Sequence, residues 1–236
     1  MVARMPISSV DDDPMQALTL FEREAVSPAP GAHYVPQWLT LQQQMDLLDL
    51  CRVWARQTAG FVVPRMFDGT PLSIRSLYLG WCWRQNRYSR FADAAGTVPV
   101  LPFPPQLRQL AQRACRQTFG DAAGFAPDSA ILNWYGAEAR LGMHQDRGET
   151  DAVIARGAPV ISISLGDSAL FRFGNGVNKS RPYVDVTLAS GDLFVFGGPS
   201  RMAYHGVPKV FNGTSPPELG PLRGRLNITI RQTGFG

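Results

Sequence analysis

From about residue 130 onward, the sequence consists of short segments in which apolar and polar residues alternate and which glycine or proline separates. Alternation with a period of two is typical of β-strands, and closely spaced short strands favour a β-sandwich or jelly roll. We expect strands at Ile131–Tyr135, Val160–Leu165, Ala169–Phe173, Tyr183–Leu188, Leu193–Phe196 and Leu226–Ile230. The pattern therefore predicts a mostly β fold with flanking helices (α+β).

Two helices are predicted upstream of these strands. Thr40 and Gln43 have the spacing of a capping box, and a helical pattern follows from Leu41 to Thr58. A second helix is expected between Pro104-Pro105 and Gly120, and both helices would buttress the β core. We expect one structural domain made of an irregular arm (1–36), a segment of helices and connecting chain packed on the core (37–128) and the β core (129–236).

Composition narrows the location and the partners. The 236 residues are 44% hydrophobic and contain no apolar run of about 18, so no membrane span is expected. The first residues lack a secretory signal, and Cys51, Cys82 and Cys115 form no pair motif, so we expect a reducing, cytoplasmic location. The net charge is −3 over residues 1–36 and +6 over residues 37–120. The basic segment suits either a polyanionic partner or a solvated arginine-rich surface.

Histidine is rare in this sequence, and the positions of two of the histidines suggest a metal site. Only His33, His144 and His205 occur, and His144 is followed two residues later by Asp146. In an extended chain these two side chains lie on the same side. Two histidines and a carboxylate on a β scaffold form the facial triad of non-heme Fe(II) oxygenases. A His-x-Asp pair alone fits a surface pair better than a metal site, but the distant His205 and the arginine-containing strand expected at Arg225–Arg231 favour the metal site. We expect His33, in the arm, to be a non-ligand.

The segment Arg225–Arg231 alternates strictly. Leu226, Ile228 and Ile230 would face the core, so the two terminal arginines would lie on the opposite face. Arginine binds carboxylates through a planar fork, so this face could hold a short dicarboxylate or simply be solvated. Asn133 and Tyr135 share a face of another predicted strand, and both can hydrogen-bond a carboxylate.

Several segments together resemble the AlkB family of nucleic-acid dealkylases, particularly its bacterial members. The resemblance extends from about residue 75 to the end. The matching segments are Leu79-Gly80-Trp81, Asn133-Trp134-Tyr135, His144-Gln145-Asp146, Val160–Gly166, Ser190-Gly191-Asp192, Gly197–Arg201, Tyr204-His205-Gly206 and Arg225–Gly234.

The resemblance implies a double-stranded β-helix with Fe(II) as metal and with 2-oxoglutarate and O2 as cosubstrates. The implied metal ligands are His144, Asp146 and His205. The implied 2-oxoglutarate ligands are Asn133, Tyr135, Arg225, Asn227 and Arg231.

The implied reaction is oxidative demethylation of bases such as 1-methyladenine and 3-methylcytosine, which releases formaldehyde, succinate and CO2. The partner would be alkylated DNA or RNA, single- or double-stranded, bound by a monomer. Residues 37–128 would include a nucleotide-recognition lid, in which Trp81 and Tyr88 match residues around the flipped base. Core burial of Trp81 is the alternative.

Two departures from the family concern base recognition. Gly148 stands where bacterial relatives have an acidic residue, with Glu149 beside it, so we expect weak discrimination between methylated adenine and methylated cytosine. The loop between Gly174 and Val184 is longer, and Lys179 and Arg181 are its candidate base contacts. Two other functions remain open: an oxygenase acting on a protein or small acid, and a non-catalytic jelly-roll binding module.

Overall fold

The computed structural model describes residues 23–66, 68–84, 87–93 and 95–236, so most of the expected arm lies outside the described residues. The helices are α2 (Leu41–Arg56), α3 (Pro105–Phe119) and the short α4 (Asp151–Ala155). The strands are β1 (Val26–Ala29), β2 (Ala32–Val35), β3 (Arg75–Leu79), β4 (Cys82–Arg84), β5 (Arg87–Ser89), β6 (Ser129–Tyr135), β7 (Leu141–His144), β8 (Val160–Gly166), β9 (Ser168–Phe173), β10 (Val184–Leu188), β11 (Leu193–Phe196), β12 (His205–Phe211) and β13 (Arg225–Arg231).

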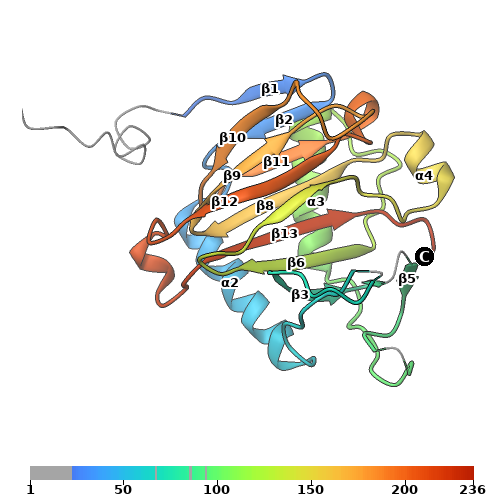
Figure 1. Cartoon of the computed structure of the whole chain (residues 1–236), viewed down its shortest axis with the longest axis vertical. Coiled ribbons are helices and arrows are strands. Elements are labelled where there is room, and N and C mark those ends of the chain that lie inside the picture. The colour runs from blue at the N-terminus through green and yellow to red at the C-terminus, as the bar shows by residue number, and fades with distance from the viewer. Residues whose placement is uncertain (1–22, 67, 85–86, 94) are drawn as a thin grey trace, which may run out of the picture.

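Two antiparallel sheets form the core (Figure 1). The larger sheet has the strand order β1-β2-β11-β8-β13-β6-β3, and the smaller has the order β10-β9-β12-β7. Neighbouring strands in each sheet are often distant in sequence, as in a jelly roll. The predicted mostly β fold with a jelly-roll core is confirmed.

The alternation along each strand separates two apolar layers. In β11, Leu193 and Val195 pack in the cluster that contains the helices, whereas Phe194 and Phe196 pack against Phe171 of the smaller sheet. Both sets are buried, because the larger sheet has helices on one face and the smaller sheet on the other. The site residues of this sheet lie on the face toward the smaller sheet.

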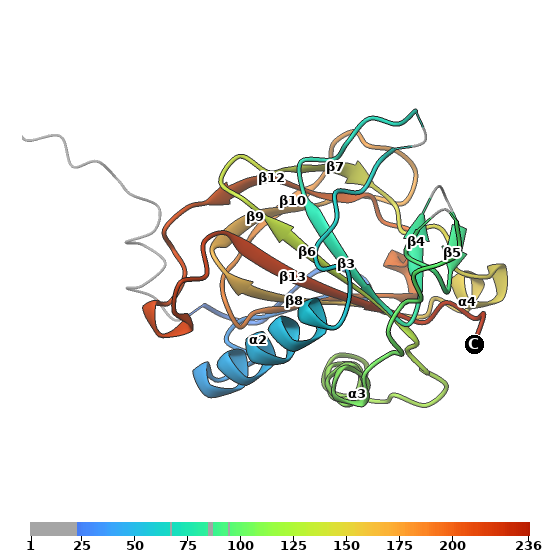
Figure 2. The ribbon, with the colours of Figure 1, turned by 90° about the horizontal axis from the view of Figure 1, so that it is seen from below.

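Helices α2 and α3 cover the outer face of the larger sheet (Figure 2). The predicted capping box is present, since the Thr40 side chain accepts from the backbone of Gln43 and the Gln43 side chain accepts from the backbone of Thr40. Helix α3 begins at Pro105 and ends at Gly120, whose φ of 77° is the left-handed conformation common after a helix. Both helices were predicted close to their observed bounds.

The segment before α2 differs from the prediction of an irregular arm. Strands β1 and β2 extend the larger sheet, because β2 pairs with β11. The buried Asp192 fixes this segment by accepting hydrogen bonds from Arg23, Tyr34 and the backbone of Gln37. Its proline and glycine residues lie at the edge and in the turn, where a strand tolerates them.

The described part of the segment between α2 and α3 consists of strands and loops. It contains β3, at the edge of the larger sheet, and the separate β4–β5 hairpin. Among the described residues, no helix is both long and apolar enough to cross a membrane.

Candidate active site

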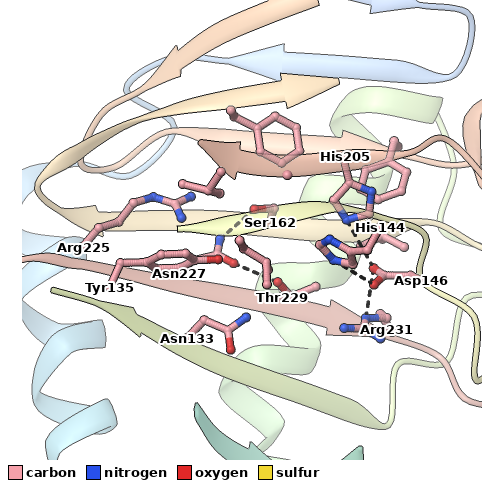
Figure 3. Close-up of a pocket in the computed structure, with 16 residues that line it drawn as sticks. Asn133, Tyr135, His144, Asp146, Ser162, His205, Arg225, Asn227, Thr229 and Arg231 are labelled. Atoms are coloured by element: carbon pink, nitrogen blue, oxygen red, sulfur yellow. Dashed lines mark hydrogen bonds and ion pairs between the residues drawn. The ribbon is translucent and has the colours of Figure 1, made fainter. Parts of the chain in front are cut away.

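Two histidines face each other where the smaller sheet ends. His144 is the last residue of β7, His205 is the first residue of β12, and the two are direct partners across the strand pair. Asp146 lies two residues beyond β7, and each of the three side chains has a ligand atom within 4.8 Å of the others. The structure thus brings together the three residues predicted from the sequence as a triad (Figure 3).

Each imidazole is oriented by a backbone carbonyl two residues earlier in the chain. The Nδ1 atom of His144 lies 2.9 Å from the carbonyl oxygen of Gly142, and that of His205 lies 3.0 Å from the carbonyl oxygen of Ala203. A carbonyl can only accept, so Nδ1 carries the proton and Nε2 has a free lone pair. The Nε2 atoms lie 3.9 Å from the Asp146 carboxylate oxygens, so the three donors converge. Metal-binding histidines are commonly oriented in this way.

The charges around Asp146 keep its carboxylate ionised. Burial disfavours the charged form, but Arg231, His205 and His144 outweigh it and hold the pKa of Asp146 well below its usual range. For the buried His205, by contrast, the surroundings disfavour the charged form. Burial and the neighbouring His144 lower its pKa to about 4. An ionised carboxylate beside a neutral His205 suits a divalent cation.

Arg225 lies at the other end of β13, near Tyr135, and is almost fully buried (Figure 3). Its Nη2 atom donates to Ser164 Oγ at 2.9 Å, while Nε and Nη1 have no hydrogen-bond partner. Burial lowers the pKa of Arg225 from its usual value, although the guanidinium stays charged. An uncompensated buried charge costs several kcal/mol, so this end of the cavity suits a carboxylate.

The cavity between Arg225 and the triad contains every residue predicted to bind the cosubstrate. Asn227 donates to Ser162 Oγ at 2.7 Å and accepts from Thr229, and Asn133 accepts from Ser76 at 2.6 Å. The complete predicted set in the cavity wall is Asn133, Tyr135, Arg225, Asn227 and Arg231.

Arg231 lies beside the triad and is already paired. Its Nε atom lies 3.4 Å from Asp146, and its Nη1 atom lies 3.3 Å from Glu149 and donates to Tyr88 at 3.1 Å. Burial lowers the pKa of this guanidinium, but Asp146, Tyr88 and Glu149 outweigh the burial and raise it. The two arginines of β13 therefore differ, because Arg231 is paired with carboxylates whereas Arg225 has two buried donors without a partner.

Glu149 and Arg201 form a buried support for this end of the site, which the sequence did not reveal. The Glu149 carboxylate lies 2.9 Å from Arg201 Nη2 and accepts from Tyr88 at 2.9 Å and from the backbone of Gly148 at 3.0 Å. Arg201 also donates to the Asp146 backbone carbonyl at 2.9 Å. With no exposed side-chain surface, Glu149 is not available to contact a base.

A second cavity adjoins the triad and shares Asn133, His144, Asp146 and Arg231 with the first. The additional walls are mainly apolar or aromatic and include Ile74, Tyr78, Trp83 and Ile131. This cavity would bring a flat substrate next to the metal-binding residues. The exposed Lys179 and Arg181 do not belong to its wall.

The structure places Trp83, rather than Trp81, in this wall. The guanidinium carbon of Arg90 lies over Trp81, 3.7 Å from the centre of the indole ring. The ring centres of Trp81 and Phe235 are 5.8 Å apart. Tyr88 lies behind Trp83, with ring centres 5.1 Å apart. Gly80, with a φ of 78°, turns the chain immediately before Trp81. Alternation along a strand could therefore not show which of the two tryptophans lines the cavity.

Comparisons with known proteins agree with this geometry. Residues 31–231 match the model of the 2OG-Fe(II) oxygenase superfamily. The chain is 38% identical over 208 residues to an alpha-ketoglutarate-dependent dioxygenase AlkB homolog of Caulobacter vibrioides, covering 86% of this chain and 88% of that protein. The chain belongs to the AlkB family of 2OG-Fe(II) oxygenases. The family model is described by its Fe(II) and 2-oxoglutarate chemistry, and the Caulobacter relative is named as an alpha-ketoglutarate-dependent dioxygenase.

Two further relatives extend the comparison. The solved structure of OsALKBH1 superimposes with a TM-score of 0.75 at 31% identity, covering 89% of this chain and 100% of that one. The DNA N(6)-methyladenine demethylase ALKBH1D of Arabidopsis thaliana is 34% identical over 220 residues, which cover 86% of this chain and 49% of that protein. This chain thus matches about half the length of that plant relative.

We expect His144→Ala, Asp146→Ala and His205→Ala each to abolish 2-oxoglutarate turnover and to reduce bound iron, because each removes one of three converging donors. His33→Ala is the matched control, since His33 lies in β2, and it should retain iron and activity. Metal analysis and succinate release measure both effects. A triad variant with full iron content and full turnover would contradict the assignment.

We expect Arg225→Lys to raise the 2-oxoglutarate concentration needed for half-maximal turnover by roughly ten- to a hundredfold, the equivalent of about 1.5–3 kcal/mol. A lysine provides a point charge in place of the fork. Arg223→Lys, two residues earlier and exposed, should leave the titration unchanged. Equal titrations for wild type and Arg225→Lys would exclude a carboxylate at this position.

Proposed function

We propose that this chain removes methyl groups from N-alkylated bases of DNA or RNA and thereby acts in alkylation repair. The observation that carries the proposal is the second cavity, whose aromatic and aliphatic walls adjoin His144 and Asp146. A flipped or single-stranded base is a flat, largely apolar ligand that such walls accommodate.

We assign the iron to His144, Asp146 and His205, and 2-oxoglutarate to the cavity that ends at Arg225. When bound, iron with 2-oxoglutarate and O2 supplies the oxidation that converts an N-methyl group to formaldehyde, with succinate and CO2 as co-products. Arg225 would hold the remote carboxylate of the cosubstrate, and Tyr135 and Asn227 would line its path. Arg231 would keep Asp146 charged and oriented.

Positively charged side chains in and beside the second cavity also support a nucleic-acid substrate. Arg147 lines the second cavity, and Arg65 and Arg84 line a groove that continues from it along the β4–β5 hairpin. Arginines at the mouth of a base-sized cavity can contact the flanking phosphates, which supply most of the sequence-independent affinity. The names of the relatives point the same way, since ALKBH1D is named as a demethylase of DNA.

The test is formaldehyde release from oligonucleotides that each carry one lesion: 1-methyladenine, 3-methylcytosine or N6-methyladenine. Each should be presented as single-stranded DNA, duplex DNA and RNA, with Fe(II) and 2-oxoglutarate. We expect at least one methylated strand to stimulate formaldehyde and succinate release in equal amounts. His205→Ala is the inactive control. Stimulation by peptides or small acids, with none by any methylated strand, would contradict the proposed function.

A further inference from the structure

The indole of Trp83 lies directly on the backbone of Gly148. A Cβ atom added to Gly148 would be 2.1 Å from Trp83 Cζ3 and 2.5 Å from Cη2, far inside van der Waals contact. The φ of Gly148 is outside the left-handed region, so its backbone would accept any residue. Glycine is required at position 148 because the Trp83 ring occupies the space of a side chain, and not because the backbone makes a turn there.

This contact is one half of a paired junction between the β4–β5 hairpin and the metal-binding segment. Trp83 and Tyr88 are direct partners across the hairpin, and they contact the adjacent residues Gly148 and Glu149. Gly148 is only two residues from Asp146 in the sequence. The hairpin is thus fixed to the segment that supplies the carboxylate of the triad.

Trp83 borders two spaces. It lines the cavity of about 150 Å³ beside His144 and also the outer groove of about 730 Å³ that includes Arg65 and Arg84. Pro64, Leu72 and Tyr78 also line both spaces, so the indole forms one side of the junction between them.

The same cavity offers no free carboxylate among its described residues. Asp146 belongs to the triad and pairs with Arg231, and Glu149 is enclosed by Arg201, Arg231 and Tyr88. A base in this cavity would contact the indole and the aliphatic walls rather than a charged acceptor. Stacking on an aromatic ring is tolerant of base identity, because every base has a π face.

We propose that Trp83 is the stacking platform for the substrate base and that Gly148 makes this possible by leaving room for the indole at that position. This inference rests on the proposed function. Any side chain at position 148 would displace the ring, remove the platform and open the inner cavity to the groove. The result would be weaker binding of methylated bases, with the metal and cosubstrate sites intact.

The test compares Gly148→Ala and Trp83→Ala with wild type. We expect each to raise the KM for a methylated oligonucleotide roughly tenfold, the size of one lost base-stacking contact. Anaerobic binding of the same oligonucleotide, followed by fluorescence anisotropy, should weaken by the same factor. Iron content should not change, and Trp83→Phe should partly restore binding of the oligonucleotide.

Two controls separate the outcomes. Gly176→Ala, where an added Cβ would meet only ordinary contacts beginning at 3.5 Å, should behave as wild type. The double variant Gly148→Ala/Trp83→Ala should be no worse than either single variant, because Gly148 acts through the indole.

An unchanged KM in Gly148→Ala, or fully additive losses in the double variant, would each overturn the inference while leaving the demethylase function standing. A wild-type enzyme that demethylates no strand would overturn both.

Discussion

Strand β12 pairs with β7 so that His205 lies directly opposite His144, and the rest of the site depends on this register. A shift by one residue would turn either imidazole to the other face of the sheet. Gly206 permits the pairing, since a Cβ there would lie 2.7 Å from the Leu141 carbonyl oxygen. Both rings are then oriented by the same local bond to a carbonyl two residues earlier.

Around this pair the fold arranges opposite charges in a buried layer. Asp146, Glu149, Arg201 and Arg231 are all buried, and each charge has an opposite partner. Buried charges are tolerated only when they are paired, so these four residues hold one another in place. Arg225 is the exception in the same cavity, with two donor atoms unpaired, and a bound dicarboxylate would complete the pattern.

The sequence predicted those parts of the fold and site that follow from local rules. The capping box of α2, the alternation along β13 and the convergence of His144 with Asp146 each depend on residues close in the chain. Strand β12 was not predicted, because Pro208 and Gly206 interrupt its pattern. The structure accommodates them where the register shifts, with Pro208 exposed.

Other features depended on contacts between distant segments. Trp83 and Trp81 are separated by one residue, and only the position of the hairpin over Gly148 distinguishes their surroundings. Likewise, the pairing of Glu149 with Arg201 and Arg231 joins three parts of the chain. The β1–β2 hairpin resembled an irregular arm because its partner strand, β11, lies about 160 residues later, too far for any local pattern.

We infer that the cavity between Arg225 and the triad holds both the metal and the carboxylates of 2-oxoglutarate. The most direct measurement is anaerobic calorimetric titration of 2-oxoglutarate into the protein with and without Fe(II). We expect the metal to tighten binding of 2-oxoglutarate in wild type, and we expect His205→Ala to lose this effect while Arg225 still provides weak binding. An affinity for 2-oxoglutarate that does not depend on the metal would contradict this inference.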